Sequence, residues 1–168
     1  DLYSRILYGA RVSLAVGLVT ALVSLFVGVF TGAVSGYYGG WTDQVLMRIV
    51  DAFYVFPSLL IAILVMVVVG QGLPAILIAL SLTGWVTTAR LVRGQVLQVR
   101  EALYVESARA MGAKDFVVLF KHIVPNLWGP ILVALTYQVP GNIMAESFLS
   151  FLGLGLQPPY SSWGTLAA

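Results

Sequence analysis

The chain has 168 residues, of which 60% are hydrophobic and 10% are charged, and its mean hydropathy is +0.95. This is far more apolar than an ordinary globular domain, and the formal net charge of +2 excludes an extended basic surface for nucleic acid. Cysteine is absent and there is a single histidine, which excludes a disulfide framework and a His/Cys metal cluster. The composition indicates a membrane protein.

Long uncharged stretches predict the helices that span the membrane. No charged residue occurs over residues 12–42 or 52–89. An apolar run of about 18 residues is long enough for a spanning helix. We therefore predict an all-α, polytopic transmembrane helical bundle, in one domain over residues 1–168. With turns placed at glycine and proline, the expected spans are at about 12–37, 45–69, 75–96 and 126–154.

Residues 1–11 have two interpretations. Leu2, Ile6 and Leu7 lie near one helical face and Arg5 lies elsewhere, which suits a short helix along the membrane interface. The same residues could instead be the frayed start of the first span.

Small residues recur every three or four positions in the first predicted span: Gly17, Ala21, Ser24, Gly28, Gly32 and Gly36. Helices in lipid associate by close packing, because the hydrophobic effect does not drive apolar surfaces together in hydrocarbon. The stripe predicts a close contact with a neighbouring helix, either static or moving.

A glycine-rich turn over residues 36–41 is expected to end the first span. Asp43 is then suited to cap the following helix, and Arg48 and Asp51 are spaced to pair on its surface. Pro57 removes one backbone hydrogen bond, so it predicts a kink in the second span.

Residues 100–126 form the one long polar stretch. Good helix formers occupy residues 101–111, and Gly112 follows where a left-handed residue that ends a helix is expected. Asp115 is suited to cap a second helix over residues 116–124. The pattern predicts a helix, a glycine turn and a second helix.

Pro125 is expected to end this second helix, and Asn126 to cap the last span. Arg48 and the six basic residues within 90–121 lie on the side of this loop, against two near the N-terminus. Because basic residues are enriched in cytoplasmic loops, the loop 97–125 is predicted to be cytoplasmic.

The polar stretch also carries a spaced motif: Glu106, Ser107 and Ala108, then Gly112, then, after nine residues, His122, Ile123, Val124 and Pro125. It resembles the EAA loop of ABC importer permeases. The usual form there is Glu-Ala-Ala, three residues, Gly, nine residues, Ile-x-Leu-Pro. Ser107, His122 and Val124 depart from this form.

Other segments resemble the C-type subunit of dipeptide and oligopeptide permeases: YGARVSL at 8–14, GYYGGW at 36–41, FPS at 56–58, FKHIVPN at 120–126 and LSFLGLGLQPP at 149–159. The resemblance covers essentially the whole chain. It implies that a first and a last helix of the full subunit are missing from this sequence.

The resemblance implies a pore-forming peptide permease subunit, not an enzyme, in the cytoplasmic (inner) membrane of a prokaryote. Its expected partners are a B-type permease subunit, two cytoplasmic ATPase subunits and an extracytoplasmic substrate-binding protein. ATP and Mg²⁺ would be bound by the ATPase subunits, with no cofactor in this chain. The expected ATPase-coupling residues are Glu106, Ser107, Ala108, Arg109, Gly112 and Pro125.

Gln138, Asn142 and Glu146 are spaced four apart in the last predicted span and share one helical face. Polar groups at membrane depth are costly and usually face protein or water. The stripe is either a set of interhelical hydrogen bonds or part of the translocation path. A proline and a glycine at 140 and 141 are expected to interrupt the span beside it.

Other functions have less support from the sequence. An intramembrane enzyme needs a nucleophile and a base, but the one histidine lies in the polar stretch and Ser35 lacks the Gly-x-Ser-x-Gly spacing. We therefore predict no catalytic or metal site. A channel would not require a docking loop of this form, and an importer of nickel or another small solute is the nearest alternative.

Overall fold

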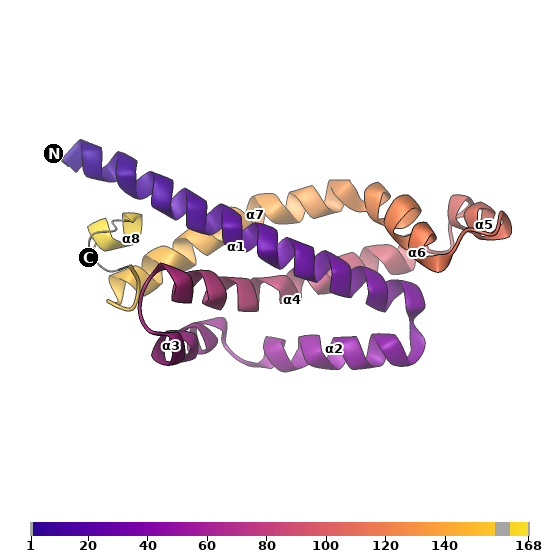
Figure 1. Cartoon of the computed structure of the whole chain (residues 1–168), viewed down its shortest axis with the longest axis horizontal. Coiled ribbons are helices and arrows are strands. Elements are labelled where there is room, and N and C mark those ends of the chain that lie inside the picture. Colours follow the sequence, from indigo (N-terminus) through magenta and orange to yellow (C-terminus); the bar gives the residue numbers. More distant parts are fainter. Residues whose placement is uncertain (1, 157–161, 168) are drawn as a thin grey trace. The chain divides into compact units, whose positions relative to one another are not determined.

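The computed structural model describes residues 2–156 and 162–167, and in that part of the chain every regular element is helical (Figure 1). The all-α prediction is confirmed. In chain order the elements are α1 (Leu2–Tyr38), α2 (Gly40–Val55), α3 (Ser58–Val69), α4 (Leu73–Val99), α5 (Leu103–Ala110), α6 (Asp115–Val117), the π-helical η1 (Val118–Ile123), the 3₁₀-helical η2 (Val124–Leu127), α7 (Trp128–Phe151) and α8 (Trp163–Ala167).

Three helical segments of the described chain are each long and apolar enough to cross a membrane: Tyr3–Tyr38, Leu73–Val99 and Asp115–Phe151. The pair α2 and α3 passes the same test only when the two helices are taken together, which gives up to four spans. The first span helix is unbroken from Leu2, so the start of the chain is part of α1 and not a separate interfacial helix.

The second predicted span is broken, not only kinked. Its helix ends at Val55, and Pro57 is the N-cap of α3 with an extended ψ of 126°. Proline cannot donate to the preceding turn, and its ring steers the residue before it away from helical geometry. The two helices are therefore separate elements.

The chain forms two compact units. The first unit contains Asp1–Ser24, Phe56–Gly84 and Leu135–Ala168. The second unit contains Leu25–Val55 and Trp85–Ala134.

In the second unit, α1 packs closely against α4 along the small-residue stripe. A Cβ atom placed on Gly32 would lie 2.3 Å from the carbonyl oxygen of Ala89, and one on Gly36 would lie 2.9 Å from that of Arg93. Contacts this short require glycine, so the predicted close packing is confirmed. The buried cluster around it contains Ala33, Tyr37, Val92, Val96, Val105, Ala108, Val118, Leu119, Ile123, Leu127 and Ile131.

Two local predictions for α2 are wrong. Asp43 does not cap the helix, because it lies in the first turn and its carboxylate binds Arg93 at 2.6 Å. Asp51 pairs with Arg90 of α4 at 2.5 Å instead of with Arg48. Both carboxylates pair with an arginine of α4 that is distant in sequence.

The first unit has its own apolar core, made of Val16, Ala62, Met66, Ala75, Ile76, Ala79, Leu80, Leu149 and Leu156. Gly17 continues the stripe here, since a Cβ on it would lie 2.5 Å from the Ile143 side chain of α7. The uncharged sequence GLGLQPPYSSW from Gly153 to Trp163 is rich in glycine and proline, which predicts a turn-rich loop. Gly153 has a φ of +78° and α8 begins at Trp163. Residues 157–161 of that loop lie outside the described residues.

Gly32→Ala tests the packing of α1 on α4. The added methyl meets backbone, which cannot rotate away, so we expect a loss of about 1–3 kcal/mol of stability and a lower Tm in detergent. Gly94→Ala is the matched control, because a Cβ on this α4 glycine meets nothing within 4 Å. It should leave Tm unchanged or raise it, by up to about 1 kcal/mol of stability. Equal Tm values for the two variants would contradict close packing at Gly32.

Candidate functional site

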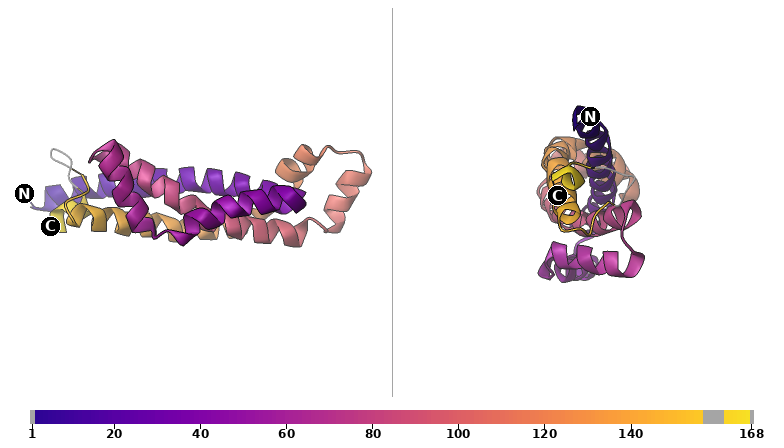
Figure 2. Two further views of the ribbon diagram at one scale, coloured as in Figure 1. Left: turned by 90° about the horizontal axis from the view of Figure 1, so that it is seen from below. Right: turned by 90° about the vertical axis from the view of Figure 1, so that its left-hand side faces the viewer.

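The polar stretch folds into a helix–turn–helix at the end of α4 in the second unit (Figure 2). The first predicted helix is shorter than expected: it begins at Leu103, after Ala102, and ends at Ala110 as α5. Gly112 has a φ of +82°, and the N–H of Ala113 donates to the carbonyl of Ala108 at 3.1 Å. The glycine turn is therefore formed as predicted, with the left-handed residue that closes a helix.

The two faces of α5 have different environments. Val105 and Ala108 are buried in the core of the second unit. Leu103 and Met111 are 81% and 82% exposed, and Glu106 is also exposed. Ala108 was expected to face a partner, but the structure places it against the chain's own core. The spaced motif from Glu106 to Pro125 did not predict the exposed apolar side chains of Leu103 and Met111.

The second predicted helix is not ended by Pro125, and that prediction is wrong. From Asp115 the chain is helical without a break to Phe151, passing through the wide turns of η1 and the tight turn of η2. Proline lacks an N–H and its ring crowds the carbonyl four residues earlier. A π-helical turn makes room for that ring. Pro125 is exposed at the start of η2, and α7 likewise continues through Pro140, where an interruption was expected.

The capping roles predicted for Asp115 and Asn126 are also wrong. Lys114 occupies the N-cap position, and the Asp115 carboxylate accepts a hydrogen bond from the Tyr37 hydroxyl at 2.7 Å. The Asn126 amide donates to the carbonyl of His122 at 2.6 Å, inside the continuous helical segment. The remaining motif residue, Ser107, is exposed and donates to the carbonyl of Leu103 within α5.

Two members of the polar stripe in α7 bind neighbouring helices of the first unit. The Gln138 amide donates to the carbonyl of Gly84 in α4 at 3.0 Å. The Asn142 amide, which is buried, donates to the Thr20 hydroxyl of α1 at 2.7 Å. These are interhelical hydrogen bonds, which was one of the two interpretations of the stripe.

Glu146 is fully buried and is surrounded by hydroxyl groups. Its carboxylate accepts from Ser13 of α1 at 3.2 Å and from Ser150 of α7 at 2.8 Å. The backbone N–H of Trp163 donates to the same Ser13 hydroxyl at 3.2 Å. A buried acid thus connects α1, α7 and the start of α8. Lining of a translocation path by this stripe stays a prediction.

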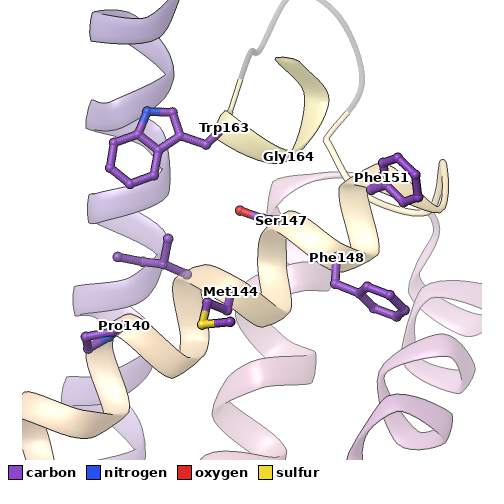
Figure 3. Close-up of a pocket in the computed structure, with 8 residues that line it drawn as sticks. Pro140, Met144, Ser147, Phe148, Phe151, Trp163 and Gly164 are labelled. Atoms are coloured by element: carbon purple, nitrogen blue, oxygen red, sulfur yellow. The ribbon is translucent and has the colours of Figure 1, made fainter. Parts of the chain in front are cut away.

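An open apolar pocket of about 590 Å³ lies between α7 and α8 in the first unit (Figure 3). Its walls include Met144, Phe148, Phe151 and Trp163, and Ser147 adds a side-chain hydroxyl to the lining. Among the described residues that line the pocket, none has a titratable side chain.

Comparison with known proteins agrees with this architecture. A family model described as "Binding-protein-dependent transport system inner membrane component" matches residues 24–168. The chain is 50% identical over 167 residues to the dipeptide transport system permease protein DppC of Bacillus subtilis strain 168, covering 99% of the chain and 52% of that protein.

Two further curated proteins are similar. The oligopeptide transport system permease protein OppC of the same organism is 49% identical over 168 residues, covering all of the chain and 55% of that protein. The glutathione transport system permease protein GsiD of Pectobacterium atrosepticum is 42% identical over 166 residues. This match covers 99% of the chain and 55% of that protein. The chain spans about half the length of these relatives.

Among solved structures, a chain of the inward-facing MetNI methionine ABC transporter matches with a TM-score of 0.78 and 21% sequence identity. The match covers 92% of this chain and 76% of that one. At this identity the likeness shows the fold alone.

Replacing Gly112 tests the turn that orients α5. Nothing lies within 4 Å of a Cβ at this position, so a side chain there is opposed by its backbone conformation and not by a clash. We expect Gly112→Val to cost about 1–2 kcal/mol and to speed hydrogen exchange of the α5 amides. Gly112→Asn is the control, because asparagine tolerates left-handed geometry; equal exchange in the two variants would contradict the left-handed turn.

Replacing Glu146 tests whether its side chain holds helices together or lines the translocation path. Glu146→Leu leaves the Ser13 and Ser150 hydroxyls without their acceptor, and we expect a loss of about 1–3 kcal/mol and a lower Tm. Glu146→Gln keeps one acceptor oxygen and should recover most of the Tm and normal uptake. A Gln variant with wild-type Tm but altered uptake would favour the path instead.

Proposed function

Because the chain belongs to the family of binding-protein-dependent transport system inner membrane components, we propose that it forms the pore-lining core of a permease subunit in an ATP-driven peptide importer. The family and the apolar helices make it a multi-pass protein of the inner membrane.

The observation that carries the proposal is the asymmetry of α5. Val105 and Ala108 fix one face of this helix on the chain's own core, while Leu103 and Met111 project from the loop almost fully exposed. Large exposed apolar side chains outside a membrane mark a protein contact. The acidic Glu106 on the same short helix adds a charge that a basic partner group can pair with.

The partner we propose for this face is a cytoplasmic ATPase subunit. An apolar helix face that enters a groove is a recurring way for proteins to recognise each other. Glu106, Ser107, Arg109 and Gly112 then belong to the coupling helix and its turn, and Pro125 to the helical segment that continues into α7. The full importer would contain two such ATPases, which bind ATP and Mg²⁺, a B-type permease subunit and an extracytoplasmic substrate-binding protein.

The substrate we propose is a dipeptide or oligopeptide. Two relatives near 50% identity are named as dipeptide and oligopeptide permeases, and the glutathione permease at 42% is less similar. Nickel or another small solute is the alternative. Uptake of labelled dipeptide and tetrapeptide by cells with the complete importer, against a nickel-uptake control, distinguishes these substrates.

Glu106→Arg tests the docking face in the complete importer. The reversed charge should weaken ATPase association and reduce uptake at least about tenfold, equivalent to roughly 1.4 kcal/mol, while the permease stays in the membrane. Glu101→Arg is the matched control, since this exposed glutamate lies on the same loop before α5. It should keep near-normal uptake. Unchanged uptake and substrate-stimulated ATP hydrolysis in Glu106→Arg would overturn the docking role.

A further inference from the structure

We infer that Tyr37, in the last turn of α1, is a positioning residue that ties the coupling helix to α1, so that movement of α5 reaches α1 as well as α7. The inference rests on the proposed function of α5. Tyr37, Arg109 and Asp115 all lie in the second unit.

Tyr37 is contacted by both parts of the helix–turn–helix. Its hydroxyl donates to the Asp115 carboxylate at 2.7 Å, at the start of α6. The Nε of Arg109, in the last turn of α5, donates to the same hydroxyl at 3.4 Å. The Arg109 guanidinium also lies 5.0 Å from the centre of the Tyr37 ring. One side chain of α1 thus binds α5 and α6 together.

The ring and the hydroxyl of Tyr37 have separate tasks. Only 7% of the residue is exposed, and its ring belongs to the buried cluster that includes Val96, Val105 and Ala108. Phenylalanine would fill the same space. The hydroxyl is therefore needed for the polar contacts with Arg109 and Asp115, and not for filling the core.

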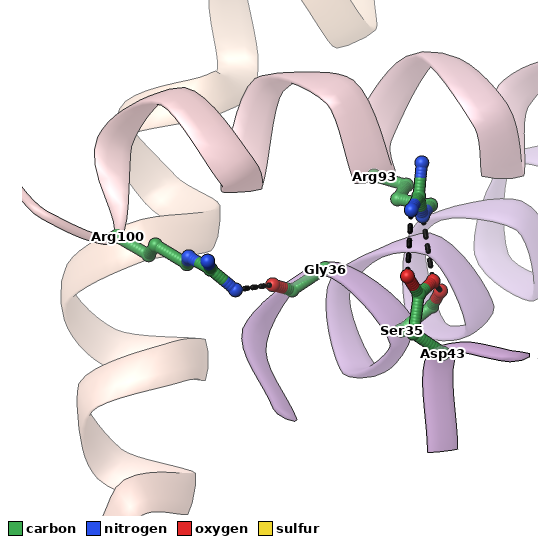
Figure 4. Close-up of polar contacts among 5 residues, drawn as sticks. All are labelled: Ser35, Gly36, Asp43, Arg93 and Arg100. Carbon is green, nitrogen blue, oxygen red and sulfur yellow. Dashed lines mark hydrogen bonds and ion pairs between the residues drawn. The ribbon is translucent and has the colours of Figure 1, made fainter. Parts of the chain in front are cut away.

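The corner between α1 and α2 is itself bound firmly to α4 (Figure 4). Arg93 donates to both oxygens of the Asp43 carboxylate at 2.6 Å, and the Ser35 hydroxyl donates to the same carboxylate. Arg100 donates to the carbonyl of Gly36 at 3.2 Å. Bidentate charged pairs of this kind fix orientation as well as distance. Tyr37 lies between these contacts in the sequence, so it is held on a well-defined support.

A displacement of α5 therefore has two routes out of the loop. One follows the backbone through the Gly112 turn into the helical segment from Asp115. The other passes from Arg109 to Tyr37, and so to the corner and α1. Arg109 is one of the residues expected to couple to the ATPase, and its guanidinium contacts Tyr37 of α1, which makes it the connecting side chain of the second route.

The test uses the complete importer with Tyr37→Phe, and Tyr38→Phe as the matched control. Tyr38 is the next residue, is 51% exposed and packs edge-on against Tyr37 through its ring. We expect Tyr37→Phe to keep membrane insertion and ATPase association, and to lower the peptide transported per ATP hydrolysed by about tenfold, as for loss of a charge-assisted hydrogen bond. Tyr38→Phe should match the wild type.

Asp115→Ala supplies a second, independent variant. Because it removes the other end of the same hydrogen bond, the double variant should be no worse than the more impaired single one. Equal transport per ATP in wild type and Tyr37→Phe, or a loss fully explained by lost ATPase association, would overturn the inference. If the wild-type complex shows no substrate-stimulated hydrolysis, it is the proposed function that fails.

Discussion

The structure of the second unit depends on the close approach of α1 to α4 at Gly28, Gly32 and Gly36. In hydrocarbon, apolar surfaces do not drive helices together, so stability comes from tight contact and from polar bonds between helices. A Cβ on Gly32 would overlap the backbone of α4. This approach brings the last turn of α1 to the end of α4, where the Gly36 carbonyl is within reach of Arg100. The positions of Asp43 and Tyr37 follow from it.

The features that the sequence predicts correctly are local ones. The helical class follows from composition, the stripe from spacing, and the turn at Gly112 from the need for a left-handed residue after a helix. Partners distant in sequence could not be predicted. Asp43 and Asp115 each stand where a cap is normal, but Asp43 pairs with the Arg93 guanidinium of α4 and Asp115 accepts from the Tyr37 hydroxyl of α1. Local propensity gives way to partners that only the folded chain brings close.

Pro57, Pro125 and Pro140 show how far tertiary context decides the outcome of a proline in or beside a helix. Pro57 breaks its helix, because it lies at an N-cap with extended geometry. Pro125 does not, because the preceding turns widen into η1 and leave room for its ring. Pro140 lies within α7, and the helix continues through it. A proline in a span predicts a local adjustment, but not whether the helix bends, widens or stops.

Buried polar side chains occur in the spans, and exposed apolar side chains occur in the polar loop. In the first unit, the polar side chains Asn142 and Glu146 are buried and hydrogen-bonded to hydroxyls of the same chain. At the two ends of α5, the apolar side chains of Leu103 and of the C-cap residue Met111 are exposed in a polar loop. A buried polar group with a partner is stable where it is, whereas an exposed apolar one gains only when another protein covers it. We therefore expect the partner contact at this exposed face, while Arg109, in the last turn of α5, contacts Tyr37 of α1.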